Sequence, residues 1–320
     1  MREGFFIRKN IEKWKKFQKE PSSYPDEMAE QFIELIDDLG YAKTYYPESR
    51  SVKYLNALTS RVYLNIYRNK KEKGSRIIQF WKTELPLIIK KHKSSLFWSM
   101  ILFLAFSIIG IVSTLHDQSF VRGVLGNAYV NMTESNIEKG DPFGVYKSED
   151  PFEMFISIAL HNTKIAFQMF VWGITGGIAT IYLLFKNGVM VGTFQTFFFL
   201  KDLGWQSVLV IWIHGTLEIS AIIIAGGAGL ILGRAVLFPG TFTRLDSIKS
   251  GVKEGIKLMF GLIPVFIAAG FLEGYVTRLT SMPVYISLSI LLGSFSFIIW
   301  YFIIYPEKVF TKQIKNLKRE

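Results

Sequence analysis

Residues 205–232 read WQSVLVIWIHGTLEISAIIIAGGAGLIL, a run of 28 residues in which Glu218 is the single charged side chain. A helix rises about 1.5 Å per residue, so this run is longer than the hydrocarbon core of a bilayer, which is about 30 Å thick. Inside lipid every backbone polar group must be bonded within the protein, and a helix achieves this by itself. The run therefore predicts a transmembrane helix in an integral membrane protein.

Five further apolar runs are expected to cross the membrane. Four of them lie at 96–115, 165–185, 259–277 and 284–305. The run at 188–200 is short, and a re-entrant segment is the alternative to a tilted span there. Because a re-entrant segment would move the basic connection that follows the quoted run to the outside, six crossings are preferred. The predicted fold class is an all-α, polytopic helical membrane protein with about six transmembrane helices.

The basic excess of the chain falls in particular connections. The 320 residues carry 37 Lys and Arg against 26 Asp and Glu, and 20 of the basic residues lie in 1–95, with 12 acidic ones. Residues 116–151 hold three basic and six acidic side chains, whereas 233–258 and 306–320 each hold five basic and two acidic. The positive-inside rule then predicts a bacterial cytoplasmic membrane protein with both termini in the cytoplasm. Because the basic residues adjoin apolar spans, the lipid bilayer is the expected partner and nucleic acid is not.

The apolar runs also set the predicted domains. A basic, cytoplasmic helical domain is expected over 1–93, where apolar residues recur at three- and four-residue steps, and a transmembrane bundle over 94–305. An extracytoplasmic segment is expected at 116–151, an interfacial helix at 151–163 and a basic cytoplasmic tail at 306–320. No signal peptide is expected, since charged residues follow the first few apolar ones without a long apolar core. The absence of cysteine excludes disulfides and thiolate chemistry.

Three G-x-x-x-G patterns lie in the predicted spans. Small residues one turn apart let helix backbones approach closely, either within one bundle or between two copies of a chain. Packing within one bundle is the preferred interpretation, and a homodimer is the alternative. The helix-packing residues are Gly173, Gly177, Gly188, Gly192, Gly229 and Gly233.

Polar residues inside the spans indicate a candidate site. His214 and Glu218 are four residues apart and therefore share one face of a helix. Glu273 lies in the span at 259–277, and an ionised group at such a depth costs about 2.5–3.5 kcal/mol or more. Counted from the outer ends of their spans, His214 and Glu273 reach similar depths in the outer leaflet. His161 and Asn162 approach the same level from outside.

Two interpretations of this site are open. It can bind an ion, a proton or a metal, or it can be a hydrogen-bonded structural clamp between spans. The structural clamp is the preferred interpretation. Two His and two Glu can in principle bind zinc, but His214-Gly-Thr-Leu-Glu218 differs from the H-E-x-x-H spacing of zinc proteases. No catalytic residue, metal or cofactor is assigned. The chain is not expected to be an enzyme, with an intramembrane hydrolase as the alternative.

Several short elements, in this order, resemble the stage II sporulation protein M family. They are DLGYAKTYYP at 38–47, YLNAL at 54–58, the Asn187-Gly188 pair, HGTLE at 214–218, FPG at 238–240 and AAGFLE at 268–273. The H-G-x-x-E element and the second glutamate are the more specific part when taken together. One departure is His161, which precedes Asn162 where the family pattern leads us to expect a pair of asparagines.

The resemblance implies a membrane scaffold. Founding members of the family are polytopic proteins that act without known catalysis and hold stage II sporulation proteins D and P, which remodel peptidoglycan. A scaffold linked to cell-envelope remodelling is therefore expected, with partner proteins binding through 1–93 and 116–151. The alternative is an ion or small-solute transporter or channel that uses the His/Glu cluster.

The predicted orientation can be tested with single cysteines in a chain that has none of its own. We expect Lys139→Cys to react with a membrane-impermeant maleimide in intact cells, and Lys9→Cys to react only after the inner side is exposed. Labelling of Lys9→Cys from outside would reverse the orientation.

Overall fold

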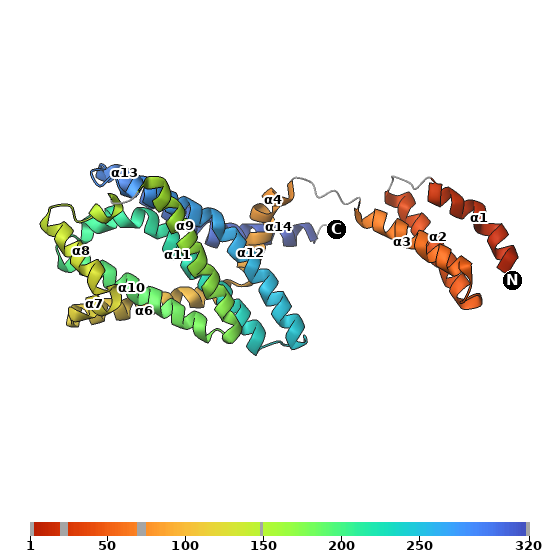
Figure 1. Cartoon of the computed structure of the whole chain (residues 1–320), viewed down its shortest axis with the longest axis horizontal. Coiled ribbons are helices and arrows are strands. Elements are labelled where there is room, and N and C mark those ends of the chain that lie inside the picture. Colours follow the sequence, from red (N-terminus) through yellow and green to blue (C-terminus); the bar gives the residue numbers. More distant parts are fainter. Residues whose placement is uncertain (1–2, 20–24, 69–74, 148–149, 318–320) are drawn as a thin grey trace. The chain divides into compact units, whose positions relative to one another are not determined.

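The computed structural model describes residues 3–19, 25–68, 75–147 and 150–317, which form helices and turns without a β-strand among them (Figure 1). The chain divides into two compact units, Met1–Arg76 and Ile77–Glu320. Six helices in the described residues are long and apolar enough to cross a membrane. The predicted all-α, polytopic fold is therefore confirmed.

The first unit consists of α1 (Glu3–Lys19), α2 (Pro25–Tyr45) and α3 (Arg50–Arg68) around a core of its own. Trp14 is only 1% exposed, and its Nε1 donates a hydrogen bond of 2.8 Å to Asp38 Oδ2. Asp38 also pairs with Lys13 at 2.7 Å. The buried core residues are Phe6, Trp14, Leu35, Leu39, Ala42, Leu55, Leu58 and Val62.

The N-terminal domain predicted over 1–93 is longer than the first compact unit, because the segment after residue 76 belongs to the second unit. Here η1 (Phe80–Glu84) leads into α5 (Leu85–Lys91), whose apolar side chains Leu85 and Ile89 are buried in the core of the bundle. The basic residues on the other face of α5 pair with acidic ones on later helices, as Lys91 does with Glu254. An amphipathic helix has the same sequence pattern on a bundle as in a separate domain, so periodicity could not place it.

The six candidate spans of the second unit begin and end at different residues from those predicted. The first is α6 (Lys93–His116), and the fourth, α11 (Gly204–Leu237), packs against all the others. The remaining helices are α9 (Pro151–Val171) with η3 (Trp172–Thr175), α10 (Ile178–Leu200), α12 (Arg244–Phe271) with η4 (Leu272–Thr277), and α13 (Val284–Ile299), which continues through η5 (Trp300–Ile304) into α14 (Tyr305–Leu317). The predicted tail at 306–320 is thus largely a helical extension of the last span.

The helices in this region have other bounds than the predicted interfacial helix at 151–163 and the predicted spans at 165–185 and 188–200. One candidate span covers 151–175 and the next covers 178–200, so the count of six is unchanged. Asp150 caps the first of these helices by accepting hydrogen bonds from the backbone N–H groups of Phe152 and Glu153. The turn between the two spans falls at Gly176 and Gly177, whose φ angles of 72° and 88° favour glycine.

Asn187 and Gly188, which resemble a helix end, instead remain inside α10. The Asn187 side chain donates to the backbone oxygen of Leu183 at 2.8 Å. A Cβ on Gly188 would lie 2.8 Å from the backbone oxygen of Phe103, so this glycine serves a contact between helices and not a turn. The same sequence element therefore has a packing role.

Five of the six G-x-x-x-G glycines, all but Gly177, lie at close contacts within the chain. A Cβ on Gly173 would lie 2.2 Å from Gly229 O, and one on Gly192 would lie 2.1 Å from Ser107 O. Gly233 packs in the same way on Gly177, where the added Cβ would be 2.6 Å from a backbone nitrogen. These residues let α9 and η3 approach α11, and α10 approach α6.

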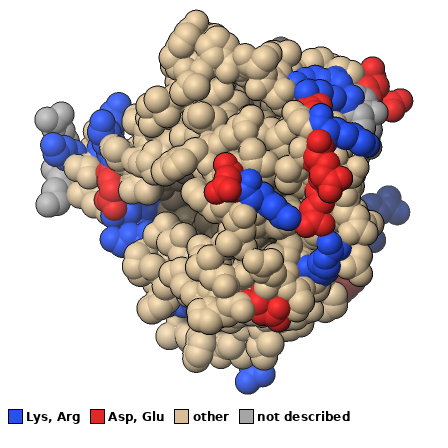
Figure 2. All heavy atoms as spheres, turned by 90° about the vertical axis from the view of Figure 1, so that its left-hand side faces the viewer, with Lys and Arg blue, Asp and Glu red and all other residues tan. Residues whose placement is uncertain are grey.

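The segment between the first two spans covers one end of the bundle with α7 (Ser119–Leu125), α8 (Asn127–Glu138) and η2 (Gly144–Lys147). Figure 2 looks at this end and shows acidic and basic side chains close together on a mostly uncharged surface. Glu134 pairs with Lys201 and with Arg122, each at 2.8 Å, and the Lys201 ammonium holds the pKa of Glu134 below its usual range. The pair with Arg122 links α8 to α7, and the pair with Lys201 links α8 to the end of α10.

Candidate functional site

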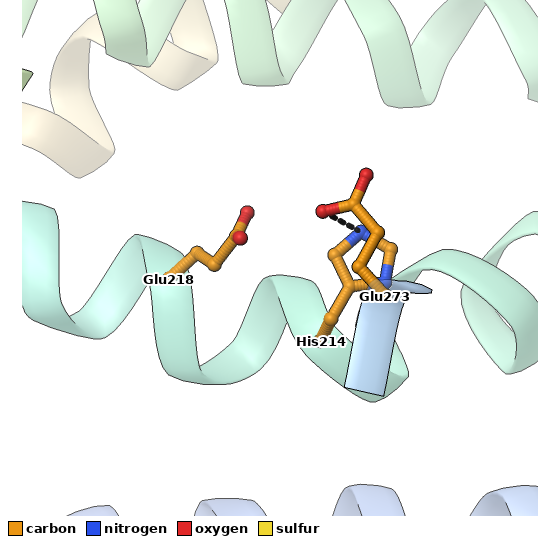
Figure 3. Close-up of side chains that lie close together, drawn as sticks. All are labelled: His214, Glu218 and Glu273. Atoms are coloured by element: carbon orange, nitrogen blue, oxygen red, sulfur yellow. Dashed lines mark ion pairs between the residues drawn. The ribbon is translucent and has the colours of Figure 1, made fainter. Parts of the chain in front are cut away.

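Helix α11 carries two of the ionisable residues on one face. His214 and Glu218 lie one turn apart, so their side chains project to the same side of the helix, as Figure 3 shows. The His214 side chain is 5% exposed and Glu218 is half-buried. The i, i+4 spacing in the sequence thus produces a pair of neighbouring polar groups inside the bundle.

Glu273 reaches this pair from the π-helical segment η4. A π-helix has one more residue per turn than an α-helix, which changes the direction of the side chains that follow it. Glu273 Oε2 lies 3.6 Å from His214 Nε2, and Thr277 Oγ1 lies 2.8 Å from His214 Nδ1. Both nitrogens of the imidazole therefore face residues of η4.

The third contribution comes from α9, where Asn162 Nδ2 donates a hydrogen bond of 2.6 Å to Glu218 Oε1. Glycines of α12 and η4 allow α9 to come close, because a Cβ on Gly274 would lie 2.7 Å from the backbone oxygen of Pro151. The neighbouring residue His161 is exposed and does not join the site. Of the five predicted site residues, the structure brings four together and leaves His161 outside.

The three ionisable residues can hold a cation. One ligand atom from each of His214, Glu218 and Glu273 can be chosen so that all three atoms lie within 4.8 Å of one another. Two carboxylates in a medium of low dielectric constant cannot both remain charged without a proton or a cation between or beside them. The chemistry that this arrangement offers is therefore binding of a cation or a proton.

A pocket of about 210 Å³ adjoins the cluster. Its polar lining residues belong to α9, α10, α11 and η2. At about 30 Å³ per water molecule, this volume is enough for several waters or a small solute. The polar residues that line it are Tyr146, Asn162, Asn187, Gln195, Trp212, His214 and Glu218.

Tyr146 of η2 lies next to His214. The two rings meet at an edge-to-face angle of 61°, with centroids 5.9 Å apart. Burial raises the pKa of the Tyr146 hydroxyl well above its usual range, and the nearby Glu273 raises it further, so the hydroxyl stays protonated. A segment outside the spans therefore contributes an uncharged polar group to the pocket.

Several residues of the site were not predicted. Thr277 follows Glu273 by four residues, and this spacing indicates that the two side chains share one face of a helix. Trp212 Nε1 of α11 donates a hydrogen bond of 2.7 Å to Gln195 Oε1 of the neighbouring helix α10. Uncharged polar residues in apolar runs are common, so their presence alone would not have singled them out. For Tyr146 the sequence contains no such signal.

Fold and site together define a polytopic helical membrane protein with a polar, partly ionisable site among its spans. The chain belongs to the stage II sporulation protein M family, whose model, described as Stage II sporulation protein M, matches residues 99–278. This match includes the His214–Glu218 element and Glu273, and it confirms the resemblance seen in the sequence. Residues 5–68 match a second model, described as a Domain of unknown function (DUF8413).

A relative is the Uncharacterized protein MJ0793 of Methanocaldococcus jannaschii. It is 30% identical over 129 residues, which are 38% of this chain and 70% of that protein. No solved structure matches the chain.

The bond between Thr277 and His214 can be tested by Thr277→Val, which keeps the size of the side chain and removes the hydroxyl. We expect a loss of about 1–3 kcal/mol in the free energy of unfolding, because a buried imidazole nitrogen loses its partner. The measurement is denaturant unfolding in detergent. The matched control is Thr193→Val, because the buried Thr193 hydroxyl has no hydrogen-bond partner. Equal losses in both variants would contradict the importance of this bond.

Proposed function

We propose that the bundle binds and transports a cation or a small polar solute through the pocket beside His214, Glu218 and Glu273. The observation that carries this proposal is the convergence of these three groups next to a pocket among membrane-spanning helices. An apolar side chain would pack in these positions without the cost of placing a charge in lipid. Residues kept at that cost usually face a partner or a wet cavity.

The neighbouring residues suggest a role for each group. The carboxylates of Glu218 and Glu273 supply the negative charge that attracts a cation, and His214 supplies a nitrogen that can bind a proton or an ion. Asn162 orients Glu218 through the hydrogen bond to Oε1. Asn187 and Gln195, which also line the pocket, are eight residues apart on α10, so polar groups extend over about 12 Å of that helix.

A flux assay tests this proposal. Protein reconstituted in liposomes is given a potassium diffusion potential, and uptake of protons, Na⁺ and Zn²⁺ is followed with internal fluorescent probes. We expect uptake of at least one of these ions above the rate of empty liposomes. Glu218→Gln should lower this rate about tenfold to a hundredfold, because loss of one charged ligand costs about 1.5–3 kcal/mol.

The control for the flux assay is Glu138→Gln, which changes an exposed glutamate of α8 outside the spans. It should transport at the wild-type rate. Background flux of all three ions with the wild-type protein would remove the transport proposal.

A scaffold is the second candidate function, and the first unit favours it. This unit has its own hydrophobic core and matches its own family model. Its surface still leaves Ile33 and Ile36 of α2, and Tyr63 and Leu64 of α3, more than 40% exposed. Exposed apolar side chains on a small helical domain suit a partner protein. Envelope remodelling, by analogy with the founding members of the family, is the process in which we propose that such partners act.

Cross-linking in membranes, followed by purification of the full chain, tests the scaffold. We expect a partner that is captured by the wild type and lost in Ile33→Glu, since a charge there would oppose an apolar contact. The matched control is Glu30→Gln on the same helix. Recovery of the wild-type protein alone under every detergent condition would contradict the scaffold.

Both proposals share one membrane orientation. We propose the cytoplasmic membrane of the cell, with both termini inside, and the distribution of basic residues supports this.

A further inference from the structure

We propose that His214, Glu218 and Glu273 bind one divalent transition-metal ion of the zinc class. The proposal rests on the proposed function, since it names the kind of cation that the same site takes. It departs from the expectation drawn from the sequence, which assigned no metal. The ligands are Nε2 of His214 and one carboxylate oxygen from each glutamate.

The distance between His214 Nε2 and Glu273 Oε2 favours an ion between them. It is 3.6 Å, which is longer than the 2.7–3.2 Å of a hydrogen bond. Two ligands that each lie about 2.0–2.1 Å from a tetrahedral zinc are about 3.4 Å apart. The observed separation is therefore closer to that of two atoms sharing a metal ion than to that of two atoms sharing a proton.

Neighbouring residues hold two of the three ligands in place. Thr277 Oγ1 lies 2.8 Å from Nδ1 of His214, and Asn162 donates to Oε1 of Glu218. In the tautomer that donates from Nδ1 to Thr277, Nε2 carries a lone pair that faces the Glu273 carboxylate. Metal-binding histidines usually donate their other N–H group in this way, and ligating carboxylates are hydrogen-bonded in turn.

The charges also balance for a divalent ion. With neutral imidazole, the two carboxylates carry a charge of −2, which one divalent cation neutralises. A single proton would leave one carboxylate charged inside the bundle, where an uncompensated charge is costly. An ion of charge +2 therefore satisfies all three groups at once.

The ligand types narrow the choice of metal. One imidazole nitrogen and two carboxylate oxygens suit zinc and its first-row neighbours, whereas soft ions such as Cu(I) prefer sulfur ligands. Three protein ligands leave a fourth position open to water or a solute, as in catalytic zinc sites. The pocket of about 210 Å³, lined by His214 and Glu218, provides space on that side.

Cobalt(II) is the probe for the test, because its visible absorption reports the ligands around it. Full-length protein without a histidine tag is stripped with a chelator in detergent and dialysed against Co²⁺. We expect retention of about one Co²⁺ per chain, with an absorption band that disappears when Zn²⁺ displaces it. His214→Gln and Glu273→Gln should each weaken Co²⁺ binding by at least about tenfold, and Thr277→Val by about 10–100-fold.

His161→Gln is the matched control, because His161 is exposed and lies outside the site. It should bind Co²⁺ like the wild type. If His214→Gln fails to fold, as judged by size exclusion and circular dichroism, Thr277→Val and Glu273→Gln decide the question. No retained Co²⁺ in the wild type, or equal binding by Thr277→Val, Glu273→Gln and His161→Gln, would overturn the metal site.

Co²⁺ binding and the liposome flux assay together distinguish the metal site from the transport function. Proton or Na⁺ flux that depends on Glu218, without Co²⁺ binding, would refute the metal site and leave transport standing. Co²⁺ binding that depends on His214, without flux of any ion, would support the metal site and remove transport.

Discussion

Backbone contacts at glycines hold the bundle of the second unit together, because lipid gives helices little hydrophobic reason to associate. Gly192 of α10 and Gly110 of α6 would each place a Cβ within 2.5 Å of a backbone oxygen of the other helix. Gly173 of η3 and Gly229 of α11 do the same for a second pair of helices. Such contacts replace side-chain burial with close van der Waals packing, and they leave no room for a larger residue.

The candidate site depends on the same kind of contact. Gly270 and Gly274 let α9 pack closely on α12 and η4, and α9 carries Asn162. Because Asn162 must reach Glu218 on α11, the site needs α9, α11 and η4 in one arrangement. The polar groups in turn link these helices through hydrogen bonds. The structural clamp and the cation site, which the sequence left as alternatives, therefore share the same residues, and one arrangement can serve both.

The number and class of the spans could be predicted because length and hydropathy are local properties of the sequence. The position of the connection between the second and third spans could not be predicted from these properties. Gly176-Gly177 and Asn187-Gly188 both resemble helix ends, and only the partners of Gly188 on α6 show that it stays helical. The division of the chain at residue 76 could not be predicted for a similar reason, since Leu85 and Ile89 are buried by helices far along the chain.

The site was predicted in part. The spacing of His214 and Glu218 fixes their shared face, and Glu273 is conspicuous as a charge in an apolar run. Adjacent residues point about 100° apart on a helix, and the sequence did not show whether His161, Asn162 or both would face inward. The π-helical turn at Glu273 and the position of Tyr146 depend on the packing of distant segments.

The central place of α11 has a consequence for biogenesis. Three spans emerge from the ribosome before α11, and each of them packs against α11 in the folded bundle. While the translocon releases them, these early spans have each other and lipid as neighbours, with α6 and α10 able to pair through their glycines. The bundle can close only when α11 and the glutamate-bearing span after it have been inserted, so assembly is expected to occur late in synthesis.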